Sequence, residues 1–195
     1  LETHPDNIQA LTTYCAVLGA RGDKEGAKKV AAHLASLPAE ATDDLYRIAT
    51  ALCETGLDEE AYEKLTLLED RLPYDENVLW FRAVAACRTQ RIDAAIGCLE
   101  TLTQLNPRKA VAEYYLERLR GVRDGEEEPF PMTYYYRVPE DEYETIAGFL
   151  MAASTAEERD VNRIASLPQL GEFFRIAFDE MEGRDEKLQA LAVRV

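Results

Sequence analysis

The chain has 195 residues, 47% of them hydrophobic, so it can bury a core and is not disordered overall. Its 37 acidic residues outnumber its 22 basic ones and leave a net charge of −15. That charge repels phosphate backbones and anionic lipid, which argues against nucleic acid and membrane surfaces as partners, although acidity also serves solubility alone. The longest apolar runs, such as residues 83–87, are far too short to span a membrane.

The four cysteines form no C-x-x-C pair and fall on predicted apolar helix faces, which is typical of reduced thiols acting as small hydrophobic residues. Reduced thiols indicate a cytoplasmic protein. The chain begins at Leu1 with no signal-peptide pattern and stops at Val195 within a helical pattern. We therefore interpret it as a fragment of a longer protein.

Three successive ranges share one two-helix pattern: 8–38, 42–73 and 76–107. In the second range, apolar residues at helical spacing form one face of a first helix, and Glu54-Thr55-Gly56 stops it. Asp58 is then predicted to cap a second helix, which Pro73 ends. The other two ranges repeat this order, so each predicts a pair of helices.

Small and breaking residues recur at a fixed distance in these ranges. Ala27, Ala61 and Ala95 are 34 residues apart, as are Pro73 and Pro107. This spacing and pattern resemble the tetratricopeptide repeat family over about residues 8–122, with the alanines where helix pairs of that family approach closely. The resemblance implies an all-α, right-handed superhelix of about three helix pairs plus an extra helix.

The rest of the chain follows a different pattern. The extra helix is predicted over residues 109–119, which closes a repeat array spanning 1–122. An acidic linker rich in Pro and Tyr occupies 123–139, with an extended stretch at 132–139. A C-terminal helical domain follows over 140–195, with helical stretches near 140–153, 156–166, 169–181 and 184–195.

The resemblance also implies that the first helix of each pair lines a concave groove. The candidate groove residues are Thr12, Tyr46, Thr50, Trp80, Val84, Arg88, Tyr114 and Arg118. The three aromatic residues in this set recur at 34-residue spacing, and aromatic side chains provide large contact area at low entropic cost. Arg88 and Arg118 are expected to be available to an acidic group. The set predicts a non-enzymatic interaction module that binds a peptide or protein.

A second interpretation assigns the same residues to internal packing. The Tyr134-Tyr135-Tyr136 run could lie along the groove, so that the chain fills its own binding surface. The array would then be a structural spacer or an oligomerisation element. An open groove lined by Tyr46 and Trp80 would disfavour this alternative.

Residues that carry chemistry are few. The two histidines, His4 and His33, have no neighbours at the spacing of a metal site or a catalytic triad. No glycine-rich phosphate loop or nucleophile elbow is present, and the acidic runs lack the spacing of a calcium loop. We therefore predict no catalytic residues, no cofactor and no metal.

Overall fold

The computed structural model describes residues 6–107, 110–130 and 132–134. These residues form seven α-helices and no strand, which confirms the all-α prediction for this part of the chain. The four helices expected after residue 140 lie outside the described residues. The chain divides into two compact units, and the first extends to Tyr134, whereas the boundaries expected at 122 and 139 stay predictions. No helix of the described part is long and apolar enough to cross a membrane.

The helices begin at regular distances along the chain. Their bounds are α1 Ile8–Ala20, α2 Lys24–Ser36, α3 Thr42–Thr55, α4 Asp58–Arg71, α5 Glu76–Arg88, α6 Ile92–Leu105 and α7 Ala110–Asp124. Successive odd-numbered helices start 34 residues apart, and so do the even-numbered ones. Each pair expected from the sequence is therefore present within the described residues, with α7 in the place of the extra helix.

Polar residues cap three of the helices. Asn7 accepts a hydrogen bond from the backbone N–H of Ala10, and Asp23 accepts one from Gly26. Asp75 caps α5 in the same way. Asp58 is not a cap, because Leu57 holds that position and makes no side-chain cap bond. Asp58 is the first residue of α4, where the positive end of the helix dipole stabilises its carboxylate. That carboxylate forms its hydrogen bonds with residues outside α4.

The turn inside each pair uses a left-handed backbone residue. Gly22 and Gly56 have φ values of 79° and 69°, and Gln90 takes the same conformation with φ 62°. Glycine adopts this region freely, whereas a residue with a Cβ atom does so at a cost of about 1 kcal/mol. The third turn therefore has the left-handed geometry of the other two turns, but with glutamine in place of glycine.

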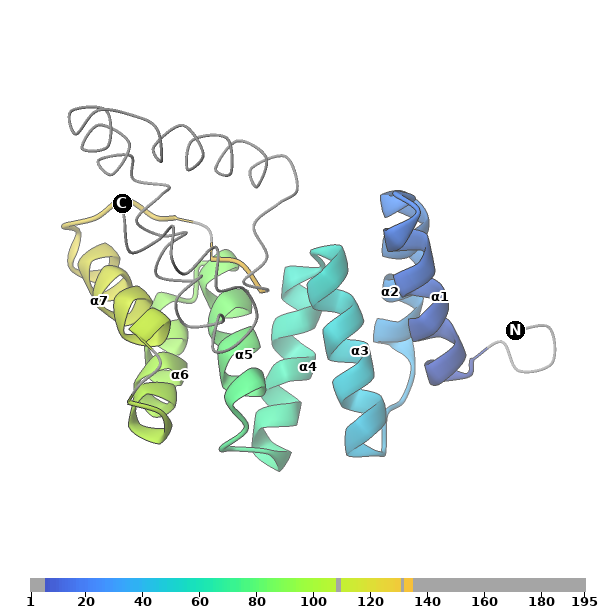
Figure 1. The fold of residues 1–195 in the computed structure, drawn as a ribbon, viewed down its shortest axis with the longest axis horizontal. Helices are drawn as coiled ribbons and strands as arrows, with labels where there is room; N and C mark the ends of the chain where they lie inside the picture. The colour runs from blue at the N-terminus through green and yellow to red at the C-terminus, as the bar shows by residue number, and fades with distance from the viewer. Residues whose placement is uncertain (1–5, 108–109, 131, 135–195) are drawn as a thin grey trace, which may run out of the picture. The chain divides into compact units, whose positions relative to one another are not determined.

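The core lies between consecutive helices. α1 packs against α2 and α3, and each later helix up to α6 packs against the one before it, which Figure 1 shows as a row of helices in chain order. Ala27, Ala61 and Ala95 are buried at these contacts. α7 joins through an edge-to-face contact of Tyr115 with Trp80, with ring centroids 5.7 Å apart. The aliphatic side chains between helices thus form one continuous core.

Candidate functional site

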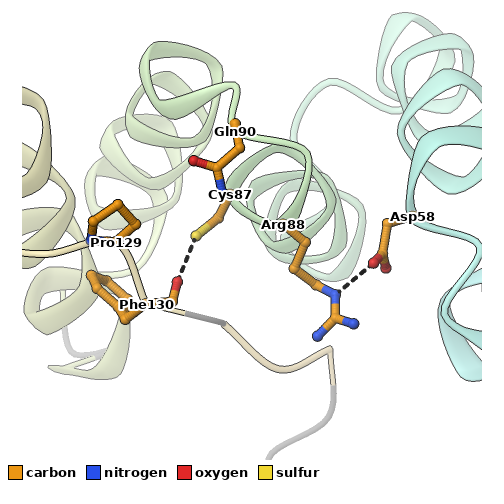
Figure 2. A pocket seen from close by; sticks show the side chains of 6 residues that line it. All are labelled: Asp58, Cys87, Arg88, Gln90, Pro129 and Phe130. Carbon is orange, nitrogen blue, oxygen red and sulfur yellow. Dashed lines mark hydrogen bonds and ion pairs between the residues drawn. The ribbon is translucent and has the colours of Figure 1, made fainter.

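A segment that follows α7 lies against α5. We call it the return segment, residues 129–130 and 132–134. Three of its backbone carbonyls accept hydrogen bonds from α5 side chains: Phe130 from Cys87 Sγ at 3.4 Å, Met132 from Arg88 Nη1 at 3.4 Å, and Tyr134 from Trp80 Nε1 at 3.1 Å. Figure 2 shows the first of these bonds. The segment is thus held through its main chain.

Two side chains of the return segment, Met132 and Tyr134, are buried in the same region, and Phe130 is half-buried. Phe130 stacks on Tyr115 with ring centroids 5.8 Å apart, and the Arg118 guanidinium carbon lies 3.8 Å from the centre of the Phe130 ring. Met132 is fully buried. Tyr134 is only 7% exposed and meets the edge of Phe81. Aromatic and apolar burial therefore adds to the main-chain hydrogen bonds.

A polar cluster anchors the end of the return segment. The Tyr134 hydroxyl donates to Asp58 Oδ1 at 2.8 Å, and Arg88 Nε donates to Asp58 Oδ2 at 2.9 Å (Figure 2 shows the ion pair). Burial, with the nearby Cys53 and Asp58, raises the pKa of Tyr134 above its ordinary value, so the hydroxyl stays a donor. One carboxylate on α4 thus joins α5 to the segment.

The predicted groove residues divide into two groups. On α5, Trp80 and Val84 are fully buried. Thr12 on α1, Tyr46 and Thr50 on α3, and Tyr114 on α7 are half-buried. Within the described residues, the Thr50 hydroxyl is enclosed without a hydrogen-bond partner. The helices α1 and α3 therefore keep surface that α5 has lost.

The two predicted cationic residues are paired within the chain. Arg88 binds Asp58, and Arg118 Nε donates to Glu127 Oε2 at 3.0 Å. Arg118 Nη1 also donates to the Tyr114 hydroxyl at 3.3 Å. Both guanidinium groups lie beside aromatic rings of the site, which lets them act as planar packing surfaces as well as charges.

A cavity of about 340 Å³ borders the return segment. Its lining residues come from α4, the end of α5, the turn after α5 and the return segment: Asp58, Cys87, Arg88, Gln90, Pro129 and Phe130 (Figure 2). The candidate groove residues predicted from the sequence include Arg88 but not Asp58 or Cys87. The signal in the sequence was the tyrosine run at 134–136. It suggested that the chain fills its own groove, but it did not indicate which residues the run would contact.

The thiols of this region are suited to packing. All four cysteines are free and buried, as expected from the sequence. Burial raises the pKa of Cys98 to about 11, and it also raises the pKa of Cys87 and Cys53. A thiol that stays protonated at neutral pH is a poor nucleophile. Within the described ranges, no group of three or more metal-ligating side chains is gathered.

A second exposed surface lies on α1. Tyr14 is 44% exposed and Val17 is 42% exposed, and both border an open hollow of about 530 Å³. The residues 34 positions later, Ile48 and Ala51, are 0% and 3% exposed in α3. The same face of the helix is thus covered in α3 and exposed in α1.

The arrangement can bind an extended main chain and aromatic side chains. Its donors are the indole, thiol and guanidinium groups of α5, and its side-chain acceptor for the Tyr134 hydroxyl is the Asp58 carboxylate. Comparison of the chain with family models, curated proteins and solved structures finds no match.

Proposed function

We propose that this chain is a non-enzymatic protein-interaction scaffold of the tetratricopeptide type. Three helix pairs and α7 would form a right-handed superhelix, with α1, α3, α5 and α7 along its inner, concave side. The 34-residue spacing of the helix starts and the left-handed turns at Gly22, Gly56 and Gln90 support this assignment. The ligand is an extended peptide or a protein segment.

One observation carries the proposal: the return segment lies on α5 as a bound peptide would. Its carbonyls at alternate residues accept bonds from Trp80, Cys87 and Arg88, and its Met132 and Tyr134 side chains are buried. Bonds to the ligand's main chain and pockets for its alternate side chains are a general mode of peptide recognition. A surface that holds one extended segment in this way is chemically able to hold another.

The half formed by α1 and α3 is the part we assign to a protein partner. Thr12, Tyr46 and Thr50 remain half-buried there, so part of each side chain stays accessible to a partner. A neutral or basic partner suits the net charge of −15. The four buried free thiols favour a reducing, cytoplasmic setting, and we propose neither nucleic acid nor a membrane as partner.

The alternative function is a structural spacer or oligomerisation element whose groove is filled by its own segment. It is favoured by Trp80, which is 2% exposed and whose indole N–H is already bonded to the Tyr134 carbonyl. A surface satisfied in this way gains nothing from a partner unless the segment leaves. The two functions therefore differ in whether α3 contacts another protein.

Site-specific photo-crosslinking tests this difference. A photoreactive phenylalanine derivative replaces Tyr46 in the full chain, and the matched control carries it at Tyr74, an exposed tyrosine between α4 and α5. The scaffold function predicts one identified protein that crosslinks from position 46 and not from position 74. The purified partner should then bind the Thr50→Arg variant at least tenfold more weakly, a loss of about 1.4 kcal/mol. Equal crosslinking from both positions, or none, contradicts the scaffold function.

A further inference from the structure

We propose that the surface of α5 covered by the return segment is a binding site for an external extended peptide with an aromatic residue, an apolar residue and a tyrosine at alternate positions. The return segment, with Phe130, Met132 and Tyr134 at these alternate positions, is its internal competitor. The inference rests on the proposed function and names the class of ligand that would bind at α5. Four observations support it: direction, pocket chemistry, attachment and the acidic anchor.

The direction and length of the contact fit an extended peptide. Phe130 and Met132 bond to Cys87 and Arg88 at the end of α5. Tyr134 bonds to Trp80 nearer the start of α5, so the segment runs back along the helix from Met132 to Tyr134. Seven helical residues rise about 10 Å. Four extended residues span about 13 Å, enough to follow that stretch at a slant. The thiol, guanidinium and indole donors of α5 thus reach three alternate carbonyls of the segment.

The pockets select residue types. The Phe130 ring has the Tyr115 ring and the Arg118 guanidinium as neighbours, which favours an aromatic side chain. Met132 is fully buried, so its position requires an apolar side chain and excludes a charge. The bond from Tyr134 to Asp58 favours tyrosine over phenylalanine, because phenylalanine would leave one carboxylate oxygen without that donor.

The connection from α7 to the return segment is exposed, and polar contacts with α7 hold it. α7 ends at Asp124, and residues 125–129 are all exposed. The Glu127 carboxylate pairs with Arg118, and the backbone N–H groups of Glu126 and Glu127 donate to the Gly121 carbonyl. Because no side chain of residues 125–129 is buried, we expect that loss of the contacts of Phe130, Met132 and Tyr134 uncovers α5 while the helices keep their packing.

Competition between the two ligands has a quantitative consequence. A segment tethered through a short connection acts at an effective concentration on the order of millimolar. An external peptide of equal intrinsic affinity therefore binds the wild-type chain weakly. It should bind at least tenfold more tightly once the return segment is weakened. That difference distinguishes an occupied binding site from a surface that is merely part of the core.

The chain contains its own reporter, because Trp80 is its single tryptophan and lies under Tyr134. The experiment uses the full chain with Met132→Asp, which puts a charge in the apolar pocket. A second variant, Tyr134→Ala, is milder and lies outside every helix. Circular dichroism must show unchanged helicity. Release should shift Trp80 emission to the red and increase its quenching by acrylamide.

The probe is a fluorescently labelled, end-blocked peptide of residues 128–135, with a matched peptide in which the tyrosine equivalent to Tyr134 is alanine. Fluorescence anisotropy should show at least tenfold tighter binding to the released variants than to wild type, and weaker binding of the alanine peptide. Bound peptide should also return Trp80 emission toward the blue. Released variants that keep their helices and show no preference for either peptide would overturn the inference.

The two proposals can fail separately. If a protein crosslinks from position 46 but no peptide binds at α5, the scaffold function is supported and the peptide site on α5 is contradicted. Unchanged Trp80 emission in both folded variants would show that the return segment cannot be displaced, which also overturns the inference. Peptide binding without a partner at position 46 keeps the α5 site and contradicts the assignment of α3.

Discussion

The helices α1 and α3 have the same spacing along the chain as α5, but their matching residues differ in how far they are exposed. In α1 and α3, Thr12 and Tyr46 are half-buried, and Tyr14 on α1 is exposed. In α5, the matching Trp80 is buried beneath the return segment. The difference teaches that position within a helix pair does not decide exposure. What covers a position is a segment or helix that lies elsewhere in the chain.

The largest expected effect comes from shortening matched aromatic residues in the two halves. Trp80→Ala removes a buried ring and its hydrogen bond, so we expect the free energy of unfolding to fall by about 3–5 kcal/mol. Tyr46→Ala removes a half-buried ring and should cost about 1 kcal/mol. Urea unfolding followed by circular dichroism measures both. Equal losses would break the comparison, because they would place the two side chains in equivalent surroundings.

The buried thiols give the second effect, which appears at alkaline pH. Burial raises the folded pKa of Cys98 from 9.0 to about 11, so the unfolded thiol ionises first. The contribution of the protonated Cys98 thiol to the free energy of unfolding is complete below pH 9. It is lost as pH rises to about 11, at about 1.4 kcal/mol per pH unit. Cys98→Ala should make the stability of the chain fall less steeply over that range. An unchanged slope in pH-dependent urea unfolding would contradict a buried, protonated Cys98.

A substitution in the third turn should have a smaller effect and should stabilise the chain rather than destabilise it. Gln90→Gly relieves a left-handed conformation that Gly22 and Gly56 adopt freely, so the free energy of unfolding should rise by about 1 kcal/mol. Gly56→Gln is the matched reverse change and should lower it by a similar amount. Thermal unfolding of the two variants measures both. A destabilised Gln90→Gly chain would show that the Gln90 side chain has a structural role beside the cavity.

The smallest effect sharpens the comparison at α1. Tyr14→Ala should change the free energy of unfolding by less than about 0.5 kcal/mol, because the side chain is exposed. Ile48→Ala, at the matching place in α3, should cost about 2–4 kcal/mol because that side chain is fully buried. Urea unfolding again provides the readout. A large loss from Tyr14→Ala would indicate that this face of α1 is covered in solution.

Much of the helical part could be predicted from residues alone. The apolar spacing, the stop at Gly56 and the breaking Pro73 mark helix ends that the structure places within a few residues. Such signals are local, because a helix and its turn are set by residues three or four positions apart. The role of Asp58 was predicted wrongly for the same reason. Its position suits a cap, but its partners, Arg88 and Tyr134, lie 30 and 76 residues away.

The candidate site could be predicted only in part. The 34-residue spacing of Tyr46, Trp80 and Tyr114 identified a set of related positions, and whether these positions bind a partner stays a prediction. Spacing could not separate buried members from half-buried ones, because burial depends on a segment more than 40 residues away from α5. The pairing of Arg88 and Arg118 with carboxylates was missed for the same reason.

The sequence by itself determined the helices, their order and their regular spacing, because each depends on apolar periodicity, turn residues and breakers close together in the chain. Only the tertiary structure decided which face of α5 is covered, which cations are paired and which turn residue is strained. Those outcomes depend on contacts between distant residues, such as Trp80 with Tyr134, and on the backbone angle of Gln90. Periodicity places side chains on a face, and packing determines what that face meets.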